Sequence, residues 1–329
     1  MTTVGVLGGG QLGRMLALAG YPLGLRFRFL DPSPESPAGQ LAERVGEPFD
    51  NPAALEASQD RLPEKRLFQR LGLPTAPFAA VGSRADLERA LEEIGLPAVL
   101  KTRRFGYDGK GQAVIRGPGD ADRAWAALGG VPLLLEGFVA FEREVSQVAV
   151  RGRDGGLAFY PLVENHHEHG ILSLTLAPAP DLSADLQEQA VEWTLRVLAA
   201  LDYVGVLAIE FFQQGEQLIA NEMAPRVHNS GHWTIEGAQT CQFENHLRAV
   251  LGWPLGDAAE LGPCAMVNLI GTSPEAPAVL AVPGAHLHLY GKSPRPGRKV
   301  GHVTVRAATA EQVRERVERV RALLPPSPG

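Results

Sequence analysis

Cysteine is scarce in this sequence, and long apolar runs are missing. Only Cys241 and Cys264 occur among the 329 residues, without a CxxC pair, so neither a disulfide framework nor a thiolate zinc site is expected. No stretch reaches the roughly 20 apolar residues of a membrane helix. The first residues also lack the basic start of a signal peptide. These absences predict a cytoplasmic protein that has no membrane partner.

Basic residues do not predominate either. The 31 Lys+Arg and 37 Asp+Glu residues give a formal net charge of -6, whereas binding to nucleic-acid phosphates calls for a broad basic surface. No nucleic-acid partner is therefore expected. Glycine and proline are abundant, with 37 and 26 residues, and their dispersal predicts many tight loops in a compact, enzyme-like chain.

The first part of the chain reads as an α/β unit. Residues 4–7 predict a buried strand, which a glycine turn joins to a helix with Leu12, Met15 and Leu16 at helical spacing. A second strand ends at Asp31, and a helical crossover between the two strands indicates parallel pairing. Residues 31–54 predict an irregular connection, and a helix is expected from Asp60 onward.

The rest of the chain alternates helical and strand patterns. The predicted helices span residues 84–94, 120–128, 184–201 and 310–324. The predicted strands span residues 97–101, 112–116, 131–139, 142–152, 156–164, 203–212, 217–224, 266–271, 286–291 and 302–307. This order mixes α/β and α+β organisation and contains no internal repeat.

A glycine pattern, GxGxxG at residues 8–13, lies between the first strand and the first helix. Two interpretations are open. Asp31 follows at about the distance at which a dinucleotide fold places its ribose-binding carboxylate, which predicts an NAD-type site. Alternatively, the glycines only permit a close turn, and the helix N-terminus faces another anion.

A glycine-rich basic loop follows the strand that ends at Lys101. Residues 102–112 carry the basic residues Arg103, Arg104 and Lys110 together with three glycines. The amide and ammonium groups of such a loop can close over a polyphosphate. The pattern is not the GxxxxGK[ST] of a P-loop, and the alternative is a flexible basic hairpin loop.

Two carboxylates lie on the strands of one predicted hairpin. Glu210 and Glu222 point to the same face if the connecting loop has an odd number of residues. A carboxylate within so apolar a strand calls for a counter-ion, which favours one or two Mg²⁺. Asn221 adds an oxygen ligand only if the strand is locally twisted. The alternative is that one glutamate faces solvent.

Hydrogen-bond donors crowd the segment after this hairpin. Arg226, His228, Asn229 and Ser230 fall within a few residues of the predicted metal pair. Such an array suits an oxyanion or a phosphorylated intermediate, because positioned charge does the catalysis there. The alternative is a polar loop without a role.

Two further segments carry weaker signals. The histidines of residues 165–169 invite a zinc interpretation, but without an HExxH helix a nucleotide-lining or surface loop is favoured. Lys292, Arg295, Arg298 and Lys299 form a basic patch in an acidic protein, which predicts a phosphate-monoester site or else a solvated turn.

Together these segments resemble the ATP-grasp superfamily and, within it, the N5-carboxyaminoimidazole ribonucleotide synthetase family. The resemblance covers almost the whole chain. It rests on GGGQLGRM (8–15), DRLPEK (60–65), GYDGKGQ (106–112), EGFV (136–139), NEMAPRVHNSGHWT (221–234) and RPGRKVGH (295–302). It implies an ATP-grasp fold with a Rossmann-like N-terminal domain (1–72), an ATP-grasp domain (73–261, in lobes 73–135 and 136–261) and a small β-rich C-terminal domain (262–329).

The resemblance also implies a reaction. A cytoplasmic, homodimeric ligase would use ATP, Mg²⁺ and bicarbonate to carboxylate 5-aminoimidazole ribonucleotide through carboxyphosphate, in de novo purine biosynthesis. The alternatives are another ATP-grasp enzyme that acts on a phosphoribosyl amine and an NAD-dependent dehydrogenase. The dehydrogenase would explain only the first thirty residues.

The family's functional residues carry over by motif. The implied nucleotide contacts are Arg61, Lys101, Gly106, Tyr107, Asp108, Gly109, Lys110, Gly111, Gln112, Glu136, Gly137, Phe138, Val139, Glu144, His167, Asn221 and Glu222, with the backbone of 136–139 reading adenine and Glu144 binding ribose. The implied metal ligands are Glu210 and Glu222. Bicarbonate or carboxyphosphate would contact Arg226, His228, Asn229 and Ser230, with His228 transferring a proton. The ribonucleotide would contact Gln11, Leu12, Tyr107, Asp108, Lys292 and Arg298.

The chain departs from the family pattern between Asp31 and Asp60. This stretch is too short for the further strand-helix unit that the family usually places there. The sheet of the first domain is therefore expected to be abbreviated.

Overall fold

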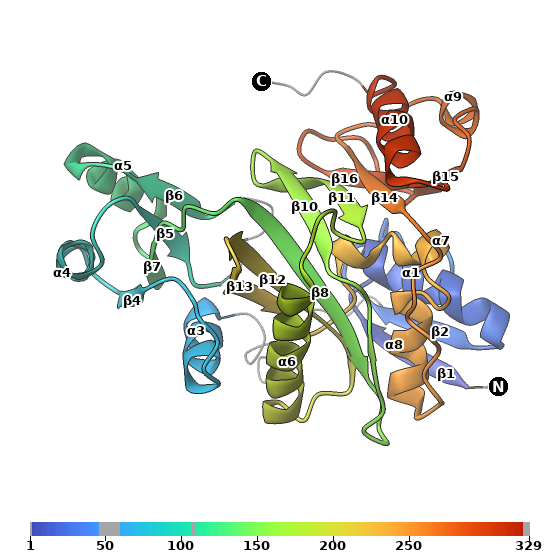
Figure 1. Cartoon of the computed structure of the whole chain (residues 1–329), viewed down its shortest axis with the longest axis horizontal. Coiled ribbons are helices and arrows are strands. Elements are labelled where there is room, and N and C mark those ends of the chain that lie inside the picture. Colours follow the sequence, from blue (N-terminus) through green and yellow to red (C-terminus); the bar gives the residue numbers. More distant parts are fainter. Residues whose placement is uncertain (1, 46–59, 105, 107–109, 325–329) are drawn as a thin grey trace.

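The computed structural model describes residues 2–45, 60–104, 106 and 110–324. Its described strands form three sheets (Figure 1). A small sheet with two helices lies at one end of the molecule, the long strands of the largest sheet cross the middle, and the N-terminal strands lie at the other end beside α8 (Figure 1). None of the described helices combines the length and apolarity that a bilayer span requires.

The first sheet is parallel and short. Its strands lie in the order β1 (Thr3–Leu7), β2 (Arg26–Leu30) and β3 (Glu43–Val45). Helix α1 (Gln11–Gly20), followed by the 3₁₀ turn η1 (Tyr21–Leu23), forms the crossover between β1 and β2. The three described strands agree with an abbreviated sheet. The prediction of an irregular connection over 31–54 is wrong for β3, because β3 pairs in parallel with β2.

The second sheet has four strands and forms the small lobe of Figure 1 together with two helices. Its order is β4 (Phe78–Val81), β7 (Leu133–Gly137), β5 (Ala98–Thr102) and β6 (Gln112–Ile115). Helices α4 (Arg84–Ile94) and α5 (Pro118–Leu128) pack on it around an apolar core that includes Leu87, Leu100 and Leu135. Helix α3 (Arg61–Arg70) packs instead against the hairpin strand β13.

The largest sheet joins the middle of the chain to its C-terminal part. Its path runs β13 (Gln217–Ala224), β12 (Gly205–Gln214), β8 (Arg143–Arg151), β10 (Val163–Glu168), β11 (Ile171–Ala177), β14 (Cys264–Ile270), β16 (Lys299–Arg306) and β15 (Ala285–Leu289), and β9 (Leu157–Phe159) pairs with β8. The C-terminal strands therefore extend the same sheet through β11 and β14 instead of forming a sheet of their own.

Helices cover both ends of this sheet. They are α6 (Ala184–Ala200), the short η2 (Asn229–Gly231) and α7 (Thr234–Gly237), α8 (Gln242–Leu251), α9 (Ala276–Leu280) and α10 (Ala310–Arg321). Helix α6 buries Leu186, Trp193 and Val197 against β8 and β13. Helix α10 buries Val313 and Val317 against β14 and β16.

Four predicted helix starts are confirmed by their caps. The side chains of Asp60, Ser83, Ser183 and Thr309 each accept a hydrogen bond from a main-chain N–H in the first helical turn.

Helix α8 was not predicted. The histidine segment 165–169 is also not a loop for most of its length, because Asn165, His166 and His167 lie in β10 and pair with β11.

His246 of α8 is a half-buried base whose titration affects the stability of the fold. Its Nδ1 accepts a hydrogen bond from the Val206 main-chain N–H at 3.0 Å. Its ring lies so close to Gly205, at a φ of 123°, that an added Cβ there would approach Cε1 to 2.9 Å. Burial lowers the pKa of His246 to about 4, against about 6.5 for an unfolded histidine. The fold therefore favours the neutral ring.

We expect His246 to make the fold acid-sensitive. Its contribution is complete above about pH 6.5 and is lost as the pH falls from there to about pH 4, because only the unfolded chain takes up the proton in that window. The residue should contribute about 1.4 kcal/mol per pH unit to the slope of the free energy of unfolding. His246→Gln, which can still accept from Val206, should remove that share, and His169→Gln, at an exposed histidine, is the matched control. Urea unfolding at several pH values measures both, and equal slopes in wild type and His246→Gln would contradict the assignment.

Candidate active site

A single cleft of about 1010 Å³ collects residues from all three sheets. Among the predicted site residues, it is lined by Gln11, Leu12, Arg61, Lys101, Gly106, Lys110, Gln112, Phe138, Glu144, His167, Glu210, Asn221, Glu222, Arg226, His228, Asn229, Lys292 and Arg298. Gly111, Glu136, Gly137, Val139 and Ser230 are not among its lining residues. Tyr107, Asp108 and Gly109 lie outside the described residues.

The two hairpin carboxylates are brought opposite each other by a β-bulge. The turn Gly215-Glu216 has two residues, which alone would pair Glu210 with Asn221. The register shifts by one residue between Glu210 and Phe211, and Glu210 consequently pairs with Glu222. Asn221 is the extra residue of the bulge and also lines the cleft. The predicted juxtaposition is thus achieved, but by a bulge and not by an odd loop.

Charge around this pair is unevenly compensated. The Arg61 guanidinium lies 2.7 Å from Glu222, and this outweighs burial and lowers the pKa of Glu222. Burial, followed by the Glu222 charge, raises the pKa of Glu210 to about 8. The same two causes raise the pKa of Glu64, which accepts from the Met223 main-chain N–H at 3.0 Å, to about 8. Glu222 is therefore paired with Arg61, whereas burial and the Glu222 charge both oppose ionisation of Glu210 and Glu64.

This donor set fits a hard divalent cation. The buried Asn221 Oδ1 has no hydrogen-bond partner among the described residues, and it lies in the cleft beside two carboxylates. Oxygen-only ligands of this kind suit Mg²⁺, which also keeps water and phosphate oxygens in its shell. Glu210, Glu222 and Asn221 are the residues that would hold it.

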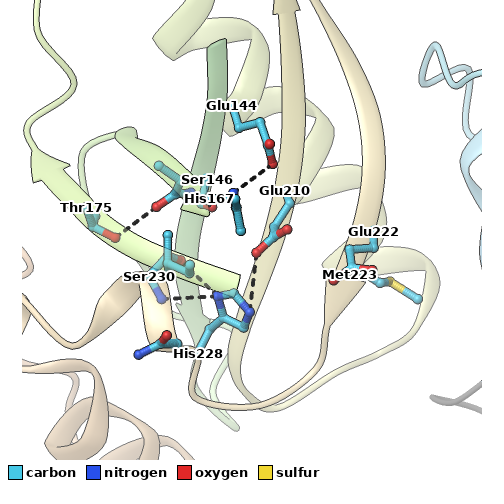
Figure 2. A network of polar contacts seen from close by, with 12 residues as sticks. Glu144, Ser146, His167, Thr175, Glu210, Glu222, Met223, His228 and Ser230 are labelled. Atoms are coloured by element: carbon cyan, nitrogen blue, oxygen red, sulfur yellow. Dashed lines mark hydrogen bonds and ion pairs between the residues drawn. The ribbon is translucent and has the colours of Figure 1, made fainter. Parts of the chain in front are cut away.

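His228 faces Glu210 from the segment after the hairpin, as Figure 2 shows. Its Nε2 lies 3.4 Å from Glu210 Oε1, and its Nδ1 lies 2.9 Å from Ser230 Oγ. The Ser230 main-chain N–H donates to Nδ1 at 3.3 Å. Because a main-chain N–H can only donate, Nδ1 is the acceptor and the neutral ring carries its proton on Nε2. Burial, followed by the Arg226 charge, lowers the pKa of His228 and keeps the ring neutral.

Ser230 itself is fully buried and points at His228 rather than into the cleft (Figure 2). Its hydroxyl and its main-chain N–H both contact Nδ1. Ser230 therefore sets the tautomer and orientation of His228, and the side chain that reaches the cleft from this pair is the histidine.

A buried charge cluster surrounds Lys101. Glu136 Oε2 lies 3.1 Å from the Lys101 ammonium and 3.2 Å from the Lys65 ammonium. Burial opposes ionisation of Glu136, but the two lysines together lower its pKa. The Glu136 side chain thus holds Lys101 at the edge of the cleft. Sequence reasoning missed Lys65, whose only signal was its place in the segment 60–65.

The backbone of 136–139 is partly committed to the protein. The Gly137 N–H donates to the Pro77 carbonyl at 2.8 Å, and the Phe138 N–H donates to the Pro97 carbonyl at 3.0 Å. These two amides are therefore used by the protein itself. The Phe138 side chain lines the cleft together with Phe141 and Phe212. The rings of Phe141 and Phe212 stack with their centroids 4.5 Å apart, so this part of the cleft wall is apolar and flat enough for a base.

Glu144 and His167 meet at one wall of the cleft (Figure 2). His167 Nδ1 lies 3.2 Å from Glu144 Oε2, and this contact, against the effect of burial, raises the pKa of His167. The ligand atoms of Glu144, His167 and Glu210 lie within 4.8 Å of one another. His166 and His169 do not join this group, so within the described residues the histidine segment does not converge on a zinc site.

The first and last parts of the chain meet across the cleft. The Lys292 ammonium donates to Gln11 Oε1 at the start of α1 and lies 5.6 Å from the centroid of the Tyr290 ring. Arg298 donates to Ser293 Oγ at 3.1 Å within the same basic segment. The structure thereby brings together the two ends of the predicted ribonucleotide site.

The Asp31 carboxylate accepts two main-chain hydrogen bonds next to the glycine turn before α1. Asp31 Oδ2 accepts from the Gly9 main-chain N–H at 2.6 Å, and Oδ1 accepts from the Ser33 N–H at 2.8 Å. One oxygen is thus engaged by the glycine turn and the other by the turn that Asp31 itself begins. Asp31 therefore stabilises the turn, and the N-terminus of α1 opens into the cleft.

Three family models match consecutive parts of the chain. The ribonucleotide synthetase preATP-grasp domain matches residues 1–62, the ATP-grasp domain matches residues 66–243, and the phosphoribosylaminoimidazole carboxylase C-terminal domain matches residues 264–316. The N5-carboxyaminoimidazole ribonucleotide synthase of Pseudomonas aeruginosa is 50% identical, over 98% of this chain and 99% of that protein.

Solved structures are similar over the whole chain. N5-carboxyaminoimidazole ribonucleotide synthetase from Thermus thermophilus superposes with a TM-score of 0.92 at 55% identity, over 99% of both chains. N5-carboxyaminoimidazole synthase from Aspergillus clavatus, in complex with ADP and 5-aminoimidazole ribonucleotide, gives a TM-score of 0.89 at 30% identity, over 98% of both chains.

Proposed function

This chain belongs to the N5-carboxyaminoimidazole ribonucleotide synthase family of ATP-grasp enzymes, and from this premise we propose how its cleft carries out the reaction. The protein is an ATP-dependent ligase that carboxylates 5-aminoimidazole ribonucleotide in purine biosynthesis. We propose that bicarbonate is the carbon source and that carboxyphosphate is the intermediate. In this scheme a bicarbonate oxygen takes the γ-phosphoryl group of ATP and releases ADP. The 5-amino nitrogen then bonds to the carboxyl carbon, phosphate leaves, and the nitrogen loses one proton.

The observation that carries this proposal is the composition of one cleft. Its wall combines the Glu210–Glu222 pair, His228 beside Glu210, and the Lys292–Gln11 contact. The carboxylate pair suits the metal of a metal-bound triphosphate, His228 suits an oxyanion, and Lys292 suits the phosphate of a phosphorylated ribose. Mg²⁺ would neutralise and orient the phosphate oxygens at Glu210, Glu222 and Asn221.

The residues of this chain then have distinct roles. Lys101, held by Glu136, would bind phosphate oxygens of ATP. The Nε2–H of neutral His228 would donate to an oxygen of bicarbonate or carboxyphosphate, with Arg226 as the adjacent cation. Lys292 and Arg298 would bind the ribose phosphate, while Gln11 and Leu12 would contact the same ligand from α1.

A product assay tests the function. We expect ADP release to require 5-aminoimidazole ribonucleotide, bicarbonate and Mg²⁺ together. Bicarbonate is the acceptor of the phosphoryl group, and the carbamate forms from bicarbonate and the amino group of the ribonucleotide. Detection of the carbamate product with ¹³C-bicarbonate confirms the bond that forms. ADP formation that is indifferent to bicarbonate would overturn the reaction, and stabilisation by NAD rather than by ATP with Mg²⁺ in a thermal shift would favour the dehydrogenase.

Removing the Lys292 ammonium is expected to weaken ribonucleotide binding selectively. Loss of a charge-assisted hydrogen bond costs about 1.5–3 kcal/mol, so the KM for the ribonucleotide should rise about 10- to 100-fold in Lys292→Ala. The KM for ATP should stay within about twofold, because this end of the cleft is the phosphate-monoester end. Arg319→Ala, an exposed cation on α10, is the control. An equal rise in both KM values would contradict the assignment.

The domain boundaries and the assembly are also part of this proposal. We place the N-terminal domain at 1–72, the ATP-grasp domain at 73–261 and the C-terminal domain at 262–329, with a homodimer in the cytoplasm. The homodimer and the location rest on the family resemblance. Sedimentation equilibrium tests the dimer, and a monomer at micromolar concentration would contradict it.

A further inference from the structure

Two buried amide side chains hold the segment of His228 from outside the cleft. They are Gln242, the first residue of α8, and Asn268, within β14; neither is among the residues that line the cleft. We propose that Gln242 and Asn268 are positioning residues for the reaction, which fix the main chain of residues 228–231 so that the His228 ring stays against Glu210. This inference rests on the proposed function, in which the ring acts on an oxyanion.

Gln242 clamps the main chain of His228 on both sides. Its Oε1 accepts from the His228 N–H at 2.9 Å, and its Nε2 donates to the His228 carbonyl at 2.6 Å. The same Nε2 lies 3.2 Å from His232 Nδ1, so one amide contacts both histidines of the segment. Gln242 is fully buried, and its own main-chain N–H donates to Thr234 Oγ1, which fixes the start of α8 to the same segment.

Gly231 leaves room for this clamp. An added Cβ at Gly231 would approach Gln242 Oε1 to 2.6 Å and Cδ to 2.7 Å. Its φ is not in the left-handed region, so the backbone alone does not call for glycine there. The side chain of Gln242 therefore lies directly over the Gly231 backbone, and this contact is what excludes a larger residue.

Asn268 holds the next residue of the segment from the opposite side. The side-chain amides of Asn268 and Asn229 bond reciprocally, at 2.7 Å and 3.1 Å, and Asn268 Nδ2 also donates to the Leu172 carbonyl at 2.8 Å. Half of the hydrogen-bonding capacity of the Asn229 side chain is thus used by Asn268. The segment is anchored to α8 through His228 and to the sheet through Asn229.

This double anchoring has a consequence for turnover. His228 contacts Glu210 at 3.4 Å and Ser230 at 2.9 Å, so a small shift of its main chain would remove both contacts. Misplacing a reacting group by about 1 Å can reduce the rate about 100-fold, whereas binding of the distant adenine and ribose phosphate is unaffected. Loss of the clamp should therefore lower kcat and leave the KM for ATP unchanged.

Gln242→Met tests the clamp with little change of volume. We expect kcat to fall about 10- to 100-fold with the KM for ATP within about twofold. Gln147→Met is the matched control, because Gln147 is equally buried and donates to the Val148 and Tyr160 carbonyls, away from the His228 segment. Both variants should lose a similar amount of Tm, but only Gln242→Met should lose turnover. Asn268→Leu should behave like Gln242→Met.

A double-mutant cycle separates positioning from general damage, and its Gly231→Ala arm remains informative if Gln242→Met does not fold. Gly231→Ala keeps every hydrogen-bonding group but displaces the Gln242 amide, so kcat should fall about tenfold. In the Gln242→Ala background the methyl group has space, and the same substitution should change kcat less than about twofold. An additive effect, or wild-type kcat in either Gln242→Met or Gly231→Ala, would overturn the inference. Wild-type enzyme without bicarbonate-dependent ADP release would instead overturn the proposed function.

Discussion

Glu222→Gln is expected to reduce kcat by about a thousandfold while the protein stays folded. A divalent cation at the phosphoryl oxygens stabilises the transition state by several kcal/mol. A thousandfold loss of kcat corresponds to about 4 kcal/mol of that stabilisation. Glutamine keeps the shape and one carbonyl oxygen of Glu222 but removes the charge that faces Glu210 across the bulge. Arg61, which lies 2.7 Å from the Glu222 carboxylate in the wild type, would then lie beside a neutral amide.

The fold should tolerate this change because Glu222 lies among like charges. Together with burial, its charge raises the pKa values of Glu64 and Glu210 to about 8. Removal of that charge therefore relieves two repulsions, with Glu64 and with Glu210, as it breaks one ion pair, and we expect the Tm to change little.

Glu216→Gln is the matched control, because Glu216 is exposed in the turn of the same hairpin. Steady-state ADP release measures kcat, and thermal shift with ATP in the presence of Mg²⁺ or of a chelator measures metal-dependent binding. Glu222→Gln should lose the difference between the two thermal shifts. If it retains more than about a tenth of wild-type kcat at saturating Mg²⁺, the metal assignment is wrong.

His228→Asn is expected to reduce kcat by about 100- to 1,000-fold without weakening ATP binding. The substitution removes Nε2, which lies toward Glu210 and carries the proton of the neutral ring. Burial and the Arg226 charge keep the pKa of this ring below its usual range. The pH dependence of kcat near neutrality should therefore not reflect titration of His228.

Ser230→Ala should cost far less, about tenfold at most, because the Ser230 main-chain N–H still donates to Nδ1 and maintains the tautomer. His286→Asn, an exposed histidine on β15, is the control for the chemistry of the substitution. Measurements of kcat and of KM for all three substrates distinguish these variants. A kcat for His228→Asn within about threefold of wild type would exclude its proposed role.

Local sequence was sufficient for most of the fold. Capping residues such as Ser83 and Ser183 and the apolar spacing behind them predicted the helices correctly, because both signals act within a few residues of each other. The strands β3, β4 and β11 and the strand character of residues 165–167 were missed. Of these, β3 and residues 165–167 are polar segments that owe their structure to neighbouring strands.

The residue types of the site were likewise readable from the sequence. Glu210, Glu222 and His228 stand out as polar groups beside apolar strands, and Lys292 stands out as part of a basic patch. Their meeting in one cleft is a property of the fold, because Gln11 and Lys292 come from opposite ends of the chain.

Three features were decided only by tertiary structure. The bulge at Asn221 puts Glu222 opposite Glu210, although the two-residue turn alone predicts the other pairing. Asp31 hydrogen-bonds to the glycine turn, 22 residues earlier in the chain, and to its own turn. Gln242 and Asn268 face His228 and Asn229 rather than any neighbour in sequence. Composition and periodicity determine which groups are present and which faces are buried. Strand register and contacts between distant residues depend on how those faces pack, and that packing determines which groups meet.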